Sequence, residues 1–184
     1  MSSPTADHSC RVAWAADAAA MAEVQVAAWR ERYGDLLPAE VLDTLDAGAI
    51  ATGWQEALSR PRDARNRVLV ALDHDLVRGY VVTGPASDPD VDPIADGELS
   101  DLTIAPDRTR QGHGSRLLHA AVDTLRADHF QRALVWITAT DDALRAFYTD
   151  AGWAPDGAHR TLDLTGDGSI QVKQIRLHAS ITEH

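Results

Sequence analysis

The chain has 184 residues, 45% hydrophobic and 24% charged, a composition typical of a globular domain with a real core. Its formal net charge of −11 argues against a basic face, so we expect no nucleic-acid partner. No apolar run of about 18 residues is present and the N-terminus lacks the features of a signal peptide, so we expect a cytoplasmic protein without membrane contact. The single cysteine, Cys10, cannot form an internal disulfide. We predict one domain over 1–184, with 1–10 flexible.

Hydrophobic spacing in the first half of the chain predicts a strand, helices and a β-hairpin. Met21, Val24 and Ala28 share one face of an alanine-rich helix, which Gly34 is placed to end. Trp29 and Tyr33 lie four residues apart on that helix, so their rings share a face, either in the core or beside a pocket. The expected elements are a strand over 11–14, helices over 17–32 and from Pro38, a helical piece holding Trp54 and Leu58, and strands 67–73 and 77–83.

The segment 84–97 is rich in aspartate and proline, and we expect a mobile, solvated loop there. The next segment, 98–125, predicts a strand, a glycine turn and a helix. Pro106 ends the strand, because proline has no N–H for the ladder. The apolar alternation slips between Leu99 and Leu102, which indicates either a β-bulge that frees backbone groups or a noisy pattern in a buried strand. The helix has one apolar face: Leu117, Leu118, Ala121, Val122 and Leu125.

The turn Arg110-Gln111-Gly112-His113-Gly114-Ser115 favours an anion. The first N–H groups of a helix have no intrahelical partner, and the helix dipole adds positive potential there. Glycine at 112 and 114 lets a phosphate approach the backbone, although a tightly packed turn is the alternative. A Walker loop is excluded because the only lysine is Lys173, and a nucleophile elbow because Ser115 directly follows Gly114.

The last third of the chain predicts a buried strand, a short helix and a final hairpin. The run 133–138 is almost continuously apolar, as in a strand covered on both faces. Asp141 suits the N-cap of a helix over 142–151, and Gly152 suits its end. Trp153 starts a short strand, a loop follows over 154–168, and a last strand is expected over 170–179.

Two of these segments resemble the signature of the GCN5-related N-acetyltransferases. Thr109-Arg110-Gln111-Gly112-His113-Gly114 is similar to the family's Gln/Arg-x-x-Gly-x-Gly/Ala, with Thr109 in place of the usual first residue. The stretch from Asp141 to Tyr148, followed by Ala151-Gly152-Trp153, is similar to Asn-x-x-Ala-x-x-Phe-Tyr-x-x-x-Gly-Phe, with Asp141 where asparagine is usual. Together the matched segments cover residues 98–153.

The resemblance implies an α/β fold (α+β, with a mixed sheet). Its elements follow one another in the order β-αα-βββ-α-β-α-ββ, and the sheet is splayed at a bulged strand. It implies acetyl-CoA as cosubstrate, with no metal. The side chain of His113 is expected to face the diphosphate or water. The implied cofactor contacts are Leu102, Thr103, Ile104, Arg110, Gln111, Gly112, His113, Gly114, Ser115, Asp141 and Tyr148.

The implied reaction is direct attack of a neutral amine on the thioester. Tyr148 is the candidate acid, and Glu98 and Asp101 are the candidate bases acting through water. A strand N–H near 102–104 is expected to stabilise the oxygen as it gains charge. Trp29, Tyr33 and Glu98 are expected to line the acceptor site. Each has a structural alternative: a core tyrosine, solvated carboxylates, or core aromatics.

The acceptor is expected to be an amine on a small molecule or a peptide, and a homodimer is compatible with the family. Two other functions stay open. The Thr109 and Asp141 departures are compatible with a non-catalytic acyl-CoA-binding or regulatory member of the fold. A structural domain with an unused turn is the third reading.

Overall fold

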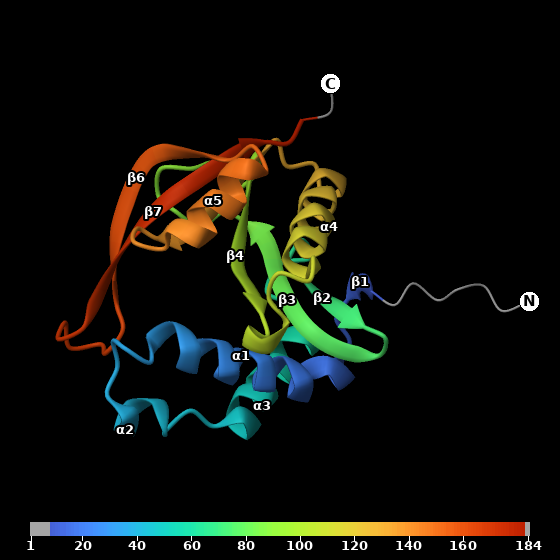
Figure 1. The fold of residues 1–184 in the computed structure, drawn as a ribbon. Helices are drawn as coiled ribbons and strands as arrows, with labels where there is room; N and C mark the ends of the chain where they lie inside the picture. The colour runs from blue at the N-terminus through green and yellow to red at the C-terminus, as the bar shows by residue number, and fades with distance from the viewer. Residues whose placement is uncertain (1–7, 183–184) are drawn as a thin grey trace, which may run out of the picture. The chain divides into compact units, whose positions relative to one another are not determined.

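The computed structural model describes residues 8–182 as five α-helices, two 3-10 helices and seven strands (Figure 1). The elements, in order, are β1 (His8–Val12), α1 (Ala18–Tyr33), α2 (Ala39–Leu42), α3 (Ala47–Ser59), β2 (Arg67–Asp73), β3 (Leu76–Pro85), β4 (Asp96–Ile104), α4 (His113–Ala127), β5 (Arg132–Thr138), α5 (Asp142–Asp150), β6 (Ala154–Asp163) and β7 (Gln171–Ser180). The strands are hydrogen-bonded in the order β1-β2-β3-β4-β5-β7-β6. The expected fold class is confirmed, and α2 is the short helix expected after Pro38.

The chain forms two compact units. The first holds the residues up to Thr83 together with Asp101–Thr124, and the second holds Gly84–Ser100 together with the residues from Leu125 onward. Strands β3 and β4 and helix α4 each contribute to both units. The single domain expected over 1–184 stays a prediction. Among residues 8–182, no helix combines the length and apolar character that crossing a membrane requires.

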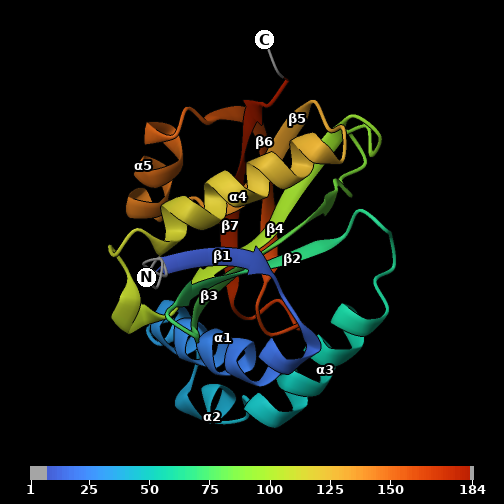
Figure 2. The same cartoon turned by 90° about the vertical axis from the view of Figure 1, so that its right-hand side faces the viewer.

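The first unit is built around the antiparallel strands β1, β2 and β3. Helices α1 and α3 cover one face of these strands and α4 covers the other (Figure 2). The core on the α1 side contains Met21, Val24 and Tyr80, and Trp54 of α3 packs against it. Burial of the stripe expected on α1 is therefore confirmed, and it explains why an alanine-rich segment with weak amphipathicity is held in place.

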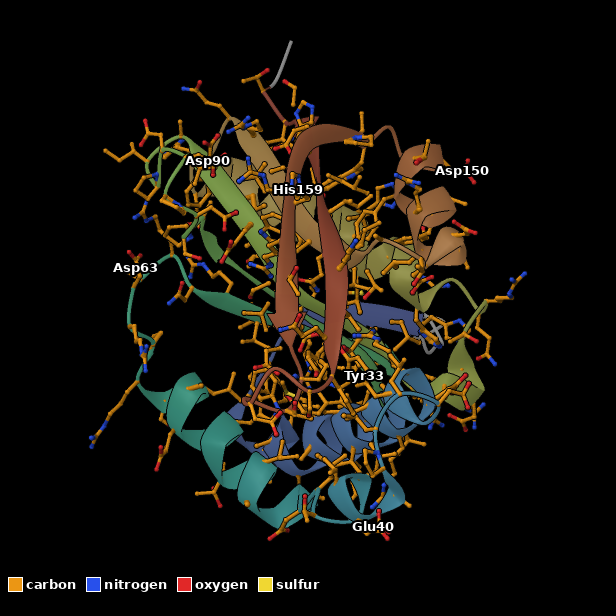
Figure 3. The ribbon with its side chains drawn as sticks, turned by 90° about the vertical axis from the view of Figure 1, so that its left-hand side faces the viewer. Tyr33, Glu40, Asp63, Asp90, Asp150 and His159 are labelled. Carbon is orange, nitrogen blue, oxygen red and sulfur yellow. The ribbon has the colours of Figure 1, made fainter. Side chains whose placement is uncertain are left out.

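The second unit is built on β5, which pairs with β4 in parallel and with β7 antiparallel. Strands β6 and β7 form a long hairpin (Figure 3). The ladder between β4 and β5 runs only from Asp96–Arg132 to Leu99–Val135, so it ends in the middle of both strands. This is the interruption that the slipped apolar pattern indicates, because residues after Leu99 have no ladder partner in β5. The β-bulge itself stays a prediction.

Several local expectations were wrong. Residues 8–10 are not a frayed end but pair with β2, while 1–7 lie outside the described residues. Gly34 follows the last residue of α1 as expected, but its φ of −59° is not the left-handed conformation. The helix after Pro38 has only four residues. Residues expected as a loop after Trp153 form β6, because pairing with β7 overrides the local turn signals and a register shift between Pro155 and His159 absorbs the irregularity.

Candidate functional site

The turn before α4 leaves backbone donors at the start of a helix. Gly112 has φ of +84° and Arg110 has φ of +60°. The Gly112 carbonyl accepts a hydrogen bond from the Arg116 amide at 3.1 Å, so the N–H groups that precede Arg116 have no helical acceptor one turn back. These amides and the helix dipole are the features from which the sequence predicts an anion site, and all of them lie in the first unit.

A second cation lies at this turn, and the sequence reasoning missed it. The guanidinium of Arg116 curls back so far that a Cβ on Gly112 would lie 3.3 Å from Nη2 and 3.7 Å from Nη1. Nη1 is buried and has no hydrogen-bond partner among the described residues. The signal in the sequence was the spacing, since a residue four positions after Gly112 lies one helical turn further on. Free amides, absent side chains and an unpaired guanidinium fit a phosphate group.

The side chain of His113 corrects one expectation. It is 1% exposed, and its ring meets the ring of His8 edge to face, with centroids 5.1 Å apart. It therefore faces neither water nor a diphosphate, because the first residue of α4 points toward β1 rather than outward. Burial lowers the pKa of the His113 imidazole, which favours the neutral ring. Only the backbone amide of His113 is left to contact an anion.

The candidate base Asp101 is engaged within the first unit. Its Oδ1 accepts a hydrogen bond from Thr103 Oγ1 at 2.6 Å and its Oδ2 accepts one from the Tyr80 hydroxyl at 3.1 Å. Burial raises the pKa of the Asp101 carboxyl, against the effect of these two donors and of Arg32. Thr103 and Tyr80 are fully buried, so both donors of the Asp101 carboxylate are shielded from solvent.

The candidate base Glu98 belongs to the second unit and has a different environment. It is half-buried, and its Oε1 accepts one hydrogen bond, from Ser87 Oγ at 3.3 Å. Burial raises the pKa of the Glu98 carboxyl, and the neighbouring Asp88 acts in the same direction, while Ser87 and Arg160 oppose it. Glu98 therefore has more unused acceptor capacity than Asp101.

Helix α5 carries the second motif. Tyr148 is 1% exposed, with its ring between Phe147 and Trp153 at centroid distances of 5.2 and 5.3 Å. Asp141 caps the helix as expected, since its Oδ1 accepts a hydrogen bond from the Leu144 amide at 2.9 Å. Gly152, at φ of +89°, follows the helix as expected. The spacing of Ala151 from Leu144 and Tyr148 predicts that it faces inward with them, but it is exposed.

Trp29 and Tyr33 form the expected ring pair at the end of α1. Their centroids are 6.3 Å apart with an interplanar angle of 81°, and both side chains are half-buried. Neither belongs to the core cluster around Tyr80, which leaves part of each ring available. Of the predicted site residues, each unit brings its own set together. The first unit holds the turn, Asp101 and the ring pair, and the second holds Glu98 and Tyr148.

Comparison with known proteins decides the family. The profile of the acetyltransferase (GNAT) family matches residues 19–153, well over half of the chain. The chain belongs to this family. Membership confirms the resemblance drawn from the two motifs, and with it the expected activity, an N-acetyltransferase that uses acetyl-CoA.

Individual relatives agree with this assignment. The chain is 28% identical over 159 residues to the uncharacterized N-acetyltransferase YuaI of Bacillus subtilis, covering 85% of this chain and 84% of that protein. Its fold is similar to yncA of Salmonella typhimurium, a putative acetyltransferase solved with acetyl-CoA (TM-score 0.69, 17% identity, 97% and 96% coverage). It is also similar to a putative phosphinothricin N-acetyltransferase (TM-score 0.73, 16% identity, 96% and 99% coverage).

Proposed function

We propose that the turn before α4 binds the diphosphate of acetyl-CoA, and that the chain transfers the acetyl group to a primary amine by direct attack. The observation that carries this proposal is the guanidinium of Arg116 beneath Gly112, with Nη1 buried and unpaired among the described residues. A buried guanidinium N–H without an acceptor is unfavourable, and an anion at the adjacent helix start would supply that acceptor. Arg110 and the amides of 112–115 complete the proposed phosphate site.

Acetyl-CoA, when bound, supplies the thioester whose acetyl carbon the amine attacks. In our proposal Glu98 accepts the amine proton through a water, and an N–H among Leu102–Ile104 donates to the acetyl oxygen as it gains charge. As the carbon–sulfur bond breaks, the hydroxyl of Tyr148 donates a proton to the leaving sulfur. The thiol has a modest pKa, so this last proton transfer assists the reaction without being indispensable.

The choice of Glu98 over Asp101 rests on their hydrogen bonds. Both oxygens of Asp101 already accept short bonds from Thr103 and Tyr80. Such bonds lower the basicity of a carboxylate and leave less room for a water. Glu98 has one bond, at 3.3 Å, and its pKa is raised mainly by burial. Burial raises the pKa of the Asp101 carboxyl as well, so the choice rests on the unused acceptor capacity of Glu98 and not on its pKa.

The acceptor is proposed to be an amine on a small molecule or peptide that meets Trp29 and Tyr33. These half-buried rings offer an apolar face near the end of α1. The amine's identity, a homodimer and a cytoplasmic location stay predictions.

A second function, acyl-CoA binding without turnover, has one observation in its favour. The side chains at both departing motif positions are used inside the chain. Thr109 Oγ1 donates to the Pro106 carbonyl at 3.3 Å, and Asp141 caps α5. Each side chain therefore has less capacity left to contact a cofactor.

One experiment separates these functions. Thiol release from acetyl-CoA is measured with pooled amines, then with single amines, and acetyl-CoA binding is measured by calorimetry. We expect micromolar binding and turnover with at least one amine. Tyr148→Phe should lower kcat roughly tenfold or more with little change in the KM for acetyl-CoA. Glu98→Gln should lower kcat/KM more than Asp101→Asn. Binding without turnover supports the second function, and no binding contradicts both.

A further inference from the structure

Arg176 of β7 makes four side-chain hydrogen bonds within the second unit. It is 4% exposed. Its Nε donates to Asp156 at 2.7 Å, Nη1 donates to Asp88 at 3.0 Å, and its two terminal nitrogens donate to the two oxygens of Asp90 at 2.8 and 2.6 Å. Asp88 and Asp90 belong to the loop between β3 and β4, in which Figure 3 labels Asp90. This loop was expected to be a mobile rim, but two aspartates tie it to a buried guanidinium.

The tied loop also contacts Glu98. Ser87, next to Asp88 in the chain, donates the hydrogen bond that Glu98 Oε1 accepts at 3.3 Å. Asp88 is fixed a second time, because its Oδ2 accepts a bond from Trp136 Nε1 at 2.9 Å. Every contact in this chain of residues lies within the second unit.

The strand register puts Arg176 and Glu98 on one face of the sheet. Glu98 is opposite Leu134 in β5, and Trp136, two residues further along β5, is opposite Arg176 in β7. Registered partners share a face, and so do residues two apart in a strand. Gly97 faces the other way, since a Cβ there would meet Leu125 and Phe130. Arg176 therefore binds the loop between β3 and β4 on the face of the sheet that also carries Glu98.

We propose that Arg176 is a positioning residue for Glu98: by binding Asp88 and Asp90 it holds Ser87 against the Glu98 carboxylate. The inference rests on the proposed role of Glu98 as the base. Arg176 touches neither Glu98 nor the reacting atoms in this proposal, and it acts only through the loop. A bidentate arginine suits this task, because its planar fork fixes direction as well as distance.

Releasing the loop changes the surroundings of Glu98 in a defined way. The charged groups that act on Glu98 are Asp88 in the loop and Arg160 on β6. Burial, the largest cause of its raised pKa, falls when the loop leaves, and the effect of Asp88 is lost with it. The backbone and side-chain hydrogen bonds of Ser87, which lower the pKa of Glu98, are lost as well, but burial is the largest single effect. The pKa of Glu98 should therefore fall toward its ordinary value.

The test compares the wild type with Arg176→Met, Arg176→Lys and Asp90→Asn in the full chain. We expect faster hydrogen exchange in residues 86–95 of Arg176→Met, a roughly tenfold or greater loss of kcat/KM, and an acidic limb of its pH profile at lower pH. Arg176→Lys keeps the charge but not the fork, so it should recover part of the loss. Asp63→Asn is the matched control, because Asp63, labelled in Figure 3, is another carboxylate bound to an arginine, Arg65.

Each outcome decides the proposal. Faster loop exchange with an unchanged acidic limb would make Arg176 merely structural and would overturn the positioning role. If Arg176→Met does not fold, Asp90→Asn and Ser87→Ala carry the test. Ser87→Ala should move the acidic limb to higher pH, because Ser87 lowers the pKa of Glu98, and an unmoved limb in both variants overturns the proposal. A wild type that acetylates no amine contradicts the proposed function itself, and the role of Arg176 falls with it.

Discussion

Gly112 occupies a position that disfavours any residue with a side chain for two reasons, its backbone conformation and its crowded surroundings. Its φ of +84° lies in the region that favours glycine, and a Cβ would lie 3.3 Å from the guanidinium of Arg116. Gly157 has a similar φ of +91°, but a Cβ there would meet nothing within 4 Å. The two positions therefore separate backbone strain from crowding at the proposed phosphate site.

We predict that Gly112→Ala and Gly157→Ala each lower the free energy of unfolding by about 1 to 2 kcal/mol, because both force alanine into a left-handed conformation. Only Gly112→Ala should also weaken acetyl-CoA binding, by roughly tenfold, since the new methyl group displaces Arg116. Denaturant unfolding and calorimetry measure the two quantities. Equal loss of acetyl-CoA affinity in both variants would show that crowding at Arg116 has no part in binding.

At this turn the sequence allowed a glycine turn at the start of a helix to be predicted, together with N–H groups that lack a helical acceptor. Both follow from the local sequence. It did not reveal that His113 points into the core beside His8, since that depends on the strand which α4 covers. Arg116 was missed for a related reason: its direction relative to Gly112 follows from the helix geometry, not from residue type.

Among the helices, α5 depends on one capping residue for its start. Asp141 caps α5 through the Leu144 amide, and Asp46 caps α3 through the amides of Gly48 and Ala49. The two caps are chemically alike, but only α5 carries the proposed acid, Tyr148. Asp46 is therefore a matched control for Asp141 in testing whether the position of α5 affects catalysis.

We predict that Asp141→Ala and Asp46→Ala each cost about 1 kcal/mol of stability, the usual value of an N-cap. Asp141→Ala should in addition lower kcat several-fold, because fraying of the first turn loosens the helix that holds Tyr148. Asp141→Asn should keep the stability, since asparagine caps equally well. Thermal unfolding and steady-state kinetics provide the measurements. A normal kcat in Asp141→Ala would remove α5 from the proposed mechanism.

Across the whole chain, the expected element order is confirmed because it rests on patterns longer than any single turn. The strand Arg67–Asp73 buries a continuous apolar run, and helices α4 and α5 each have one apolar face, so packing and local spacing agree. Prediction from the sequence failed for segments whose structure depends on a partner distant in the chain. Residues of β6 carry turn-forming proline and glycine, and only the distant β7 makes them a strand. The bonds of Arg176 to the acidic loop join residues 86 and 88 positions apart, beyond the reach of any spacing rule.

Ion pairs of both units predict how stability responds to acid. Asp17 accepts bonds from Arg11 at 2.7 and 3.0 Å in the first unit, and Asp96 accepts two from Arg132, both at 2.8 Å, in the second. The arginine hydrogen bonds are the largest cause that lowers the pKa of each carboxyl below the ordinary 3.8. A carboxyl whose pKa is lower when folded stabilises the fold while it is ionised. That contribution is complete above the ordinary value and is lost as the pH falls through the folded value.

We therefore predict that the contribution of these two ion pairs is complete above about pH 5 and is lost below about pH 4, while the lowered pKa of His113 makes the fold less stable as the pH falls from about 7 toward 5. Glu98 and Asp101 act in the opposite sense, because their raised pKa values favour the fold when they are protonated, below their ordinary range. Asp17→Asn and Asp96→Asn should be less stable than the wild type at pH 7 but lose less on acidification. Glu40→Gln, at an exposed carboxyl of α2, is the control and should follow the wild type (Figure 3). Urea unfolding at each pH measures these values, and parallel acid loss in all four proteins would contradict the assignment to the two ion pairs.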